Sequence, residues 1–173
     1  MKLDLITNKN DEFYTPRYAI KPILKYIPKG SYVTCPFDTG ESLIVDEFLE
    51  HGCDVSWSHI THGGDFFTAP KPYTDFIVSN PPYSMKGDVF EKLFGWGIPF
   101  AMLVGVVGLF ESQRRFNLFK NNLFEIMYLN KRVAYFKDYS DEKPSLNPPF
   151  SSVWLCSGVL PDRIIFEEVD KRA

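Results

Sequence analysis

The sequence predicts an α/β domain built on a mostly parallel sheet, with helices packed on both faces of that sheet. Short apolar runs alternate along the chain with stretches whose apolar residues recur at helical spacing. This alternation is typical of strand–helix–strand units, in which the strands run parallel. No linker, repeat or low-complexity tract divides the sequence, so residues 1–173 are predicted to form a single domain.

The first half of the chain is predicted to alternate helices with strands. Thr15 followed by Pro16 is typical of a helix start, and Gly52 is typical of a helix end. The helix that ends at Gly52 places Ile44, Val45, Phe48 and Leu49 on one face. The predicted elements are a helix over Arg17–Tyr26, a strand over Ser31–Phe37, a helix over Ser42–His51, and strands over Asp54–Ile60 and Asp75–Ser79.

The second half continues the alternation and closes with extended segments. We predict a helix over Gly87–Trp96, a strand over Phe100–Val107, a helix over Ser112–Asn122, a strand over Phe124–Leu129, and extended segments over Val133–Lys137 and Ser152–Gly158. One strand near the C-terminus is expected to be antiparallel. The loops Pro36–Glu41, His59–Phe67 and Asn80–Ser84 all follow predicted strands, where ligands bind in such folds.

Composition predicts a cytoplasmic protein without membrane association or a metal site. No apolar run reaches the length of a membrane span, and Met1–Leu5 lacks a signal-peptide core. Two histidines, His59 and His62, have no further Cys or His partner at ligand spacing. The three cysteines are spaced for neither zinc nor disulfides and are expected to be reduced and mostly buried: Cys35, Cys53 and Cys156.

Charge is unevenly distributed along the chain. The net charge is −3, yet residues 112–137 carry +5 and the remainder carries −8. One interpretation is a solvated helix face followed by a basic loop. The other is a surface that contacts phosphates, for which the candidate residues are Arg114, Arg115, Lys131 and Arg132.

The tetrapeptide Asn80-Pro81-Pro82-Tyr83 directly follows the apolar run Phe76–Val78 and Ser79. The Asn80 side-chain oxygen and the Pro81 carbonyl are placed to accept the two N–H groups of an amine, which moves electron density onto its nitrogen. Prolines stiffen the loop because they fix φ, and Tyr83 offers a flat face to a base. A second copy, Asn147–Phe150, follows a polar stretch and is interpreted as a loop before an edge strand, without a catalytic part.

With these loops placed, the chain resembles the S-adenosylmethionine-dependent amino-methyltransferases of nucleic acids, especially small phage-type DNA adenine methyltransferase-like proteins. The resemblance spans about residues 10 to 160 and rests on the Asn-Pro-Pro-Tyr motif, on Asp11–Pro16 and on Cys35–Ser42. It implies a Rossmann-like methyltransferase fold, S-adenosylmethionine as cofactor, and methylation of adenine N6 in DNA. A duplex target would have to be flipped out of the helix.

The resemblance also implies the cofactor-binding residues. Tyr14, Thr15 and Pro16 would close over the methionine end of the cofactor. Phe37 and Gly40 survive from the family's Asp-Pro-Phe-x-Gly-x-Gly motif, in which Cys35 replaces the acid and Ser42 the second glycine. A ligand for the cofactor's ammonium would then be Asp38 or Glu41.

The family commonly ends the second strand with an acid that holds the ribose, and residues 56–60 offer none. Single hydrogen bonds from Ser58 or His59 would remain, with Trp57 or Ile60 beside the adenine. Asp65 and Phe66 match the pair that binds the cofactor's adenine in the family. The alternative for Asp65 is a turn residue after two glycines.

The sequence offers no insert large enough to recognise a site of several bases. The only candidate for such an insert is Lys137–Pro149. Its shortness predicts low sequence specificity, single-stranded or RNA substrates, or a protein partner that supplies specificity. The same catalytic motif also serves chemistry on protein glutamine amides. Since fold does not imply function, a non-catalytic methyltransferase-like scaffold that binds a host or phage partner is the alternative from another class.

Overall fold

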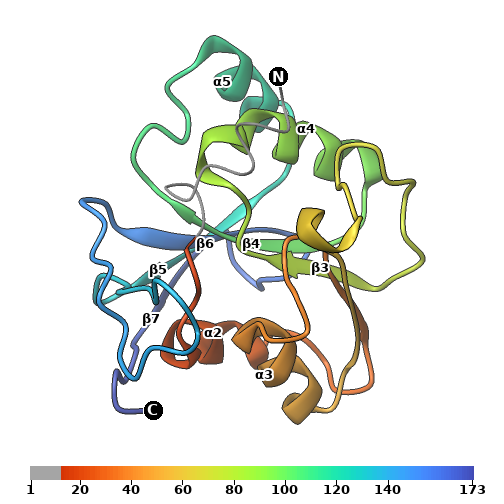
Figure 1. Cartoon of the computed structure of the whole chain (residues 1–173). Helices are drawn as coiled ribbons and strands as arrows, with labels where there is room; N and C mark the ends of the chain where they lie inside the picture. The colour runs from red at the N-terminus through yellow and green to blue at the C-terminus, as the bar shows by residue number, and fades with distance from the viewer. Residues whose placement is uncertain (1–12) are drawn as a thin grey trace.

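The computed structural model describes residues 13–173, which form a seven-stranded sheet covered by helices on both faces (Figure 1). The sheet order is β2-β1-β3-β4-β6-β5-β7. Only β6 runs antiparallel to its neighbours, so the predicted mostly parallel sheet with an antiparallel strand near the C-terminus is confirmed. The strands are β1 Tyr32–Cys35, β2 Asp54–Trp57, β3 Phe76–Ser79, β4 Phe100–Gly105, β5 Glu125–Leu129, β6 Ser152–Ser157 and β7 Ile164–Glu167.

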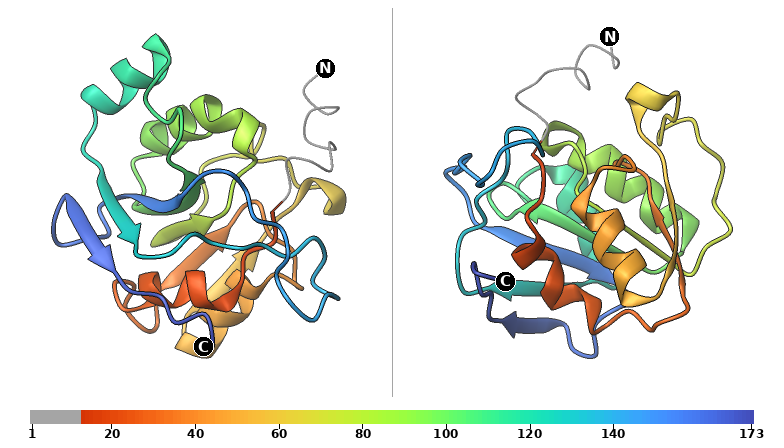
Figure 2. Two further views of the ribbon diagram at one scale, coloured as in Figure 1. Left: turned by 90° about the vertical axis from the view of Figure 1, so that its left-hand side faces the viewer. Right: turned by 60° about the horizontal axis from the view of Figure 1, so that its bottom comes forward.

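Within residues 13–173, two helices cover each face of the sheet (Figures 1 and 2). On one face lie α2, Arg17–Leu24, and α3, Leu43–His51; on the other lie α4, Lys86–Trp96, and α5, Gln113–Lys120. Their predicted positions are confirmed to within two residues. Ser112 caps α5, because its Oγ accepts from the Arg115 N–H, and Gly52 ends α3 in the left-handed region at φ 99°. Ser42 precedes α3 without a side-chain cap hydrogen bond. Short 3₁₀ turns occupy Ile60–His62 and Tyr83–Met85.

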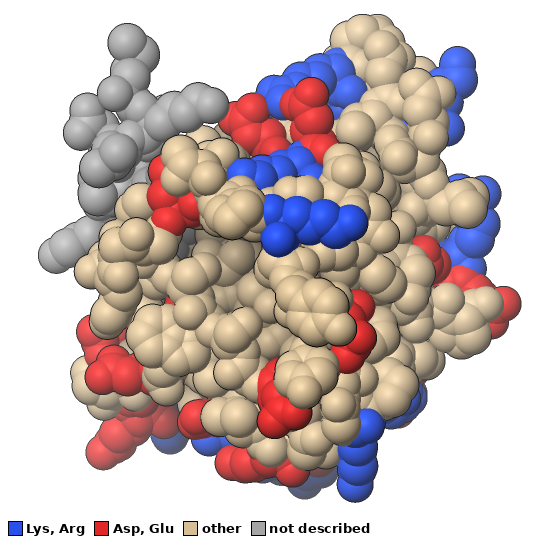
Figure 3. All heavy atoms as spheres, turned by 90° about the vertical axis from the view of Figure 1, so that its right-hand side faces the viewer, with Lys and Arg blue, Asp and Glu red and all other residues tan. Residues whose placement is uncertain are grey.

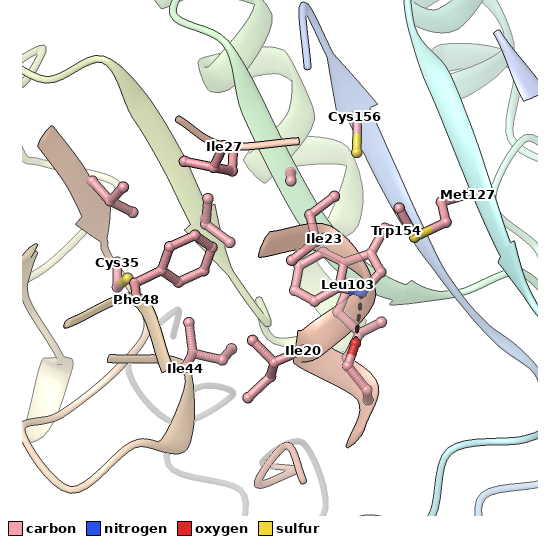
Figure 4. Close-up of a cluster of buried hydrophobic side chains, with 14 of the residues drawn as sticks. Ile20, Ile23, Ile27, Cys35, Ile44, Phe48, Leu103, Met127, Trp154 and Cys156 are labelled. Atoms are coloured by element: carbon pink, nitrogen blue, oxygen red, sulfur yellow. Dashed lines mark hydrogen bonds between the residues drawn. The ribbon is translucent and has the colours of Figure 1, made fainter. Parts of the chain in front are cut away.

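The core beneath α2 and α3 is dense and tied by polar contacts (Figure 4). Trp154 of β6 is fully buried, and its indole Nε1 donates to the Ala19 carbonyl of α2 at 2.9 Å. Arg17 of α2 donates to the buried Glu47 of α3 at 2.8 Å. These contacts fix α2 and α3 against each other and against the sheet, which holds the loops at the carboxyl ends of β1 and β3 in place.

The chain order creates a switch point between β1 and β3. From β1 the chain moves outward to β2, and it then crosses back to place β3 on the opposite side of β1. Loops leaving the carboxyl ends of β1 and β3 therefore diverge and leave a crevice, which is where ligands bind in open parallel sheets. The loop after β3 begins with Asn80.

Some predicted elements differ from the structure. The segment Val133–Lys137 belongs to no strand and makes two isolated bridges, Tyr14 with Phe136 and Tyr135 with Leu146. The strand after the second Asn-Pro-Pro copy is not an edge strand, because β6 pairs with both β4 and β5. On that side of the sheet the edge strand is β7, which the sequence patterns did not predict. The predicted strand Asp54–Ile60 ends at Trp57 because His59 caps the following 3₁₀ turn.

All three cysteines are buried free thiols, as the sequence predicts. No helix within residues 13–173 is long and apolar enough to span a membrane. The predictions for Met1–Leu5, Asp11 and Glu12 fall outside the described residues.

Candidate active site

A pocket of about 410 Å³ lies at the carboxyl ends of β1, β2 and β3. It brings together most of the predicted site residues: Tyr14, Thr15, Phe37, Asp38, Gly40, His59, Asp65, Phe66, Asn80 and Pro82. Four of the predicted catalytic and cofactor-binding residues do not line it, namely Pro16, Ser58, Pro81 and Tyr83. Ser58 instead packs on the loop, since a Cβ placed at Gly64 would come within 2.9 Å of its Cβ.

Asn80 has one satisfied and one unsatisfied polar atom. Its Nδ2 donates to the Phe13 carbonyl at 2.7 Å and to Thr15 Oγ1 at 3.1 Å. These bonds fix the amide orientation. Its Oδ1 is buried and has no hydrogen-bond partner among the described residues. An unsatisfied buried acceptor costs about 1–3 kcal/mol, so its presence at a pocket indicates a site for a donor on a ligand.

Tyr83 is held by a chain of hydroxyl groups. Its OH donates to the Tyr135 OH at 3.1 Å, and the Tyr135 and Ser152 hydroxyls are 2.6 Å apart. Burial raises the pKa of Tyr135 to about 12, so it remains a neutral phenol at physiological pH. Lys86 Nζ lies 5.5 Å from the Tyr83 ring centroid. The ring is therefore anchored to β6 while one side of it meets a cation.

The second Asn-Pro-Pro copy is close to the first. Phe150 packs against Tyr83 with ring centroids 5.1 Å apart, and Phe13 packs against the same ring at 4.7 Å. Gly105 makes room for this, because a Cβ there would lie 2.7 Å from the Phe150 ring. Asn147 is exposed, and its amide donates to the Ser145 carbonyl at 3.3 Å. The second copy therefore contacts the loop after β3 through the Phe150 ring, whereas its Asn147 side chain turns to Ser145.

Asp38 is a buried carboxyl at the pocket wall. It is 5% exposed and accepts a hydrogen bond from Ser79 Oγ at 2.5 Å. Burial raises its pKa to about 6, although hydrogen bonds from Ser79 and Ser42 and the nearby His59 act in the opposite direction. The described residues that line the pocket include no Lys or Arg, but they do include four acids: Asp38, Glu41, Asp65 and Asp138. Such a lining favours a cationic ligand.

Aromatic side chains form much of the remaining wall. Gly40 lies against the Trp57 indole, where an added Cβ would be 3.3 Å from Cζ2. Phe66 is buried and packs on Phe37 at 4.8 Å between centroids. Asp65 Oδ1 accepts from the Phe67 backbone N–H at 2.9 Å, so Asp65 has the turn role that was its alternative. This bond leaves Oδ2 for a ligand.

Two histidines share one hydroxyl group in the pocket wall. Thr61 Oγ1 lies 2.7 Å from His59 Nδ1 and 3.0 Å from His62 Nδ1. Within the described part of the chain, no group of three His, Cys, Asp or Glu side chains is placed to hold a metal ion. The His59 imidazole caps the 3₁₀ turn, because its Nδ1 accepts from the Thr61 N–H at 3.2 Å.

The segment Lys137–Pro149 contributes residues that sequence reasoning missed. Asp138 and Tyr139 line the pocket, and the Tyr139 ring packs on Tyr14 at 4.8 Å between centroids. Burial raises the pKa of Tyr139, and Asp38 adds to that shift. The sequence feature that could have indicated this role is Tyr139, an aromatic residue within a polar stretch. Part of the candidate recognition insert, Lys137–Pro149, thus forms the wall of the pocket.

The four basic candidates lie outside the pocket lining. Arg114 pairs with Asp88 at 3.0 Å and with Glu91, and Arg115 donates to the Gly108 and Leu109 carbonyls at 2.7 and 3.1 Å. Lys131 and Arg132 are exposed after β5. On the face in Figure 3, Lys and Arg are interspersed with Asp and Glu. Their role in binding phosphates stays a prediction.

The sequence matches no protein-family model and no curated protein. Among solved structures it is similar to a modification subunit of a putative type I restriction enzyme from Vibrio vulnificus YJ016, with a TM-score of 0.60 and 14% identity. That match covers 96% of this chain and 49% of the other, so the chain spans about half of that protein's length.

Two further solved structures are similar. The 23S rRNA methyltransferase ErmE has a TM-score of 0.52 and 14% identity, covering 83% of this chain and 69% of the other. A dimethyladenosine transferase from Plasmodium falciparum has a TM-score of 0.49 and 12% identity, covering 84% of this chain and 62% of that chain. The sheet order, the helices on both faces, and the likeness to the Vibrio vulnificus modification subunit and to ErmE show that the chain has the Rossmann-like methyltransferase fold.

Proposed function

We propose that this protein is an S-adenosylmethionine-dependent methyltransferase that acts on an exocyclic amino group, with adenine N6 in DNA as its preferred substrate. The observation that carries the proposal is the buried, unpartnered Oδ1 of Asn80 in the loop that follows β3. An amino group that donates to this oxygen satisfies it and gains electron density on nitrogen. The Pro81 carbonyl is proposed to accept the second N–H.

The pocket fits the cofactor by size and by charge. Its volume of about 410 Å³ lies in the range of small-molecule sites. Its acids and lack of Lys or Arg among the described lining residues suit a ligand with a sulfonium and an ammonium group. Bound there, the cofactor supplies an electrophilic methyl group. Asp38 is proposed to face its cationic part, with Phe37, Trp57 and Phe66 forming apolar walls.

The surrounding residues orient both partners of the reaction. Thr15 and the Phe13 backbone hold the Asn80 amide so that Oδ1 stays available. Tyr83 is proposed to stack on the target base, with its ring fixed through Tyr135. In this structure Phe13 and Phe150 pack on that ring, so base entry requires them to shift. Holding the acceptors and the ring in advance lowers the entropic cost of reaching the transition state.

The substrate class follows from weaker observations. The likeness includes one protein named as a modification subunit of a restriction enzyme and one named as an rRNA methyltransferase, so RNA is the second candidate. Part of the segment Lys137–Pro149 is engaged at the pocket. We therefore propose that a protein partner supplies sequence recognition.

The test is Asn80→Ala, assayed for methyl transfer to DNA and to RNA and for binding of S-adenosylhomocysteine by calorimetry. Transfer should be lost, by about a hundredfold or more, because the acceptor acts on the nucleophile. Cofactor binding should stay within a few-fold of the parent. Asn147→Ala, at the exposed second copy, is the matched control and should behave like the parent. Equal turnover in the Asn80 variant rules out this loop as the catalytic one.

A further inference from the structure

The carboxyl end of β2 presents an aromatic ring to the pocket where an acid was expected. Trp57 is the last residue of β2 and lines the pocket. Neighbouring Ser56 faces Thr34, with hydroxyl oxygens 3.1 Å apart, and Ser58 packs on Gly64. No carboxylate of β2 or of the residues directly after it lines the pocket. A ligand with a vicinal diol, such as a ribose, therefore needs its acceptor from another loop.

Three of the four pocket carboxylates already accept hydrogen bonds from the protein. Asp38 accepts from Ser79 Oγ at 2.5 Å, and Asp65 accepts from the Phe67 N–H at 2.9 Å. Asp138 accepts from Ser140 through both its backbone N–H and its hydroxyl, at 2.8 and 2.7 Å. The fourth is Glu41, and no hydrogen bond or ion pair of its carboxylate is found within residues 13–173.

Glu41 lies next to the point where the β1 loop touches β2. Its neighbour Gly40 contacts the Trp57 indole so closely that a Cβ there would be 3.3 Å from the ring. The turn is fixed internally, because Thr39 N–H donates to Ser42 Oγ at 3.0 Å and Glu41 N–H donates to Thr39 Oγ1 at 3.3 Å. The exposed Glu41 side chain thus extends from a rigid turn at the rim of the pocket beside a flat apolar face.

We propose that Glu41 holds the ribose hydroxyls of the cofactor, in place of the missing acid of β2, with Trp57 as the apolar face beneath the sugar. This inference rests on the proposed function. A carboxylate has two acceptor oxygens and matches the two donors of a vicinal diol, and each such charge-assisted bond is stronger than a neutral one. Glu41 is consequently a positioning and specificity residue, and it touches no reacting atom.

The test is calorimetric binding of S-adenosylhomocysteine and of its 2′-deoxyribose analogue to the parent, Glu41→Ala and Glu168→Ala. The parent should prefer the ribose compound by about tenfold or more, which is the worth of one charge-assisted hydrogen bond. Glu41→Ala should bind S-adenosylhomocysteine about ten- to a hundredfold more weakly and bind both compounds alike. Glu168→Ala, which removes an exposed acid outside the pocket lining, is the matched control and should keep the parent's preference.

Each outcome decides between the two levels of the proposal. Binding by the parent with a preference that survives in Glu41→Ala, or that disappears in Glu168→Ala, overturns the assignment of Glu41 and leaves the cofactor site standing. Binding by the parent without any ribose preference also overturns it. Absence of binding of both compounds by the parent overturns the cofactor proposal and this inference together.

Discussion

Two buried polar groups, the Asp38 carboxyl and the Asn80 Oδ1 atom, follow adjacent strands at the same pocket. Each is costly to the folded protein: burial disfavours the charged form of the carboxyl, and the amide oxygen is an acceptor without a donor among the described residues. Sites that bind ligands accept such costs because the ligand completes the missing contact.

The stability of the protein should depend on the ionisation of Asp38. Its pKa is raised from 3.8 to about 6 in the folded protein, so between these values the folded state binds a proton that the unfolded state has released. Stability contributed by this group is present at low pH and is lost as pH rises through about 6. Asp38→Asn should thus stabilise the protein by up to about 3 kcal/mol at pH 8 and much less at pH 4.

Urea unfolding at several pH values measures this effect. A stability difference between Asp38→Asn and the parent that is independent of pH would show that the carboxyl is not buried as described. The same variant should bind S-adenosylmethionine more weakly at pH 8, since the proposed contact with its cationic part is lost.

Cofactor affinity should depend on Asp65 and Phe37. We expect Asp65→Ala and Phe37→Ala each to weaken binding of S-adenosylhomocysteine by about 1–3 kcal/mol, through loss of a polar and of a packing contact. Titration calorimetry is the measurement. If both variants bind like the parent, the cofactor lies elsewhere.

At the scale of elements, local signals predict the helices well and the short strands poorly. Gly52 and Ser112 mark helix ends by chemistry that acts within a few residues. By contrast, β7 is four residues long, and it is defined by pairing with β5 across more than thirty positions of the chain. Such pairing leaves little local pattern, and this explains why β7 and the central place of β6 were not predicted.

The contact between the two Asn-Pro-Pro copies is likewise nonlocal, and Gly105 provides its test. Gly105→Ala would place a Cβ 2.7 Å from the Phe150 ring, so Phe150 must move away from Tyr83. We expect a loss of stability of about 1–3 kcal/mol and lower methyl transfer. Gly95→Ala is the control: it lies within α4 with open space around its Cβ, and it should stabilise the protein slightly. Thermal unfolding of both variants compares them, and equal melting temperatures contradict the packing described here.

At the scale of the whole molecule, charge is the feature that composition describes least well. The net charge of −3 gives no indication of which basic residues are available. The structure shows Arg114 held between two acids, whereas Lys131 and Arg132 are exposed. Local sequence patterns do not indicate these ion pairs, because Asp88 and Glu91 lie more than twenty positions away from Arg114.

Nucleic-acid affinity should therefore depend on Lys131 and Arg132 more than on Arg114. Charge reversal of both to Glu should weaken binding to all sequences alike and reduce the slope of log affinity against log salt by about 1 per lost contact. Lys21→Glu, at an exposed position of α2, changes charge in the same sense and should leave the slope unchanged. Salt titrations of binding to labelled oligonucleotides decide it. A flat salt response in the parent would favour a substrate other than nucleic acid.

The pocket itself could be predicted in outline, since Asn80, Asp65, Phe37 and Tyr14 converge as expected. Tyr139 and Asp138 could not, because their place depends on how residues 137–149 fold back on the N-terminal segment through the bridge between Tyr14 and Phe136. That bridge joins Tyr14 and Phe136, which lie far apart in the sequence, so no local pattern indicates it.

The central claim is that Asn80 activates an adenine amino group for methylation. Mass spectrometry of nucleosides from the DNA and RNA of cells that express the parent or Asn80→Ala tests it most directly. The account predicts N6-methyladenine in the DNA of cells with the parent and only background levels with the variant. The same level of methylated adenine in both, or none in either, would contradict it.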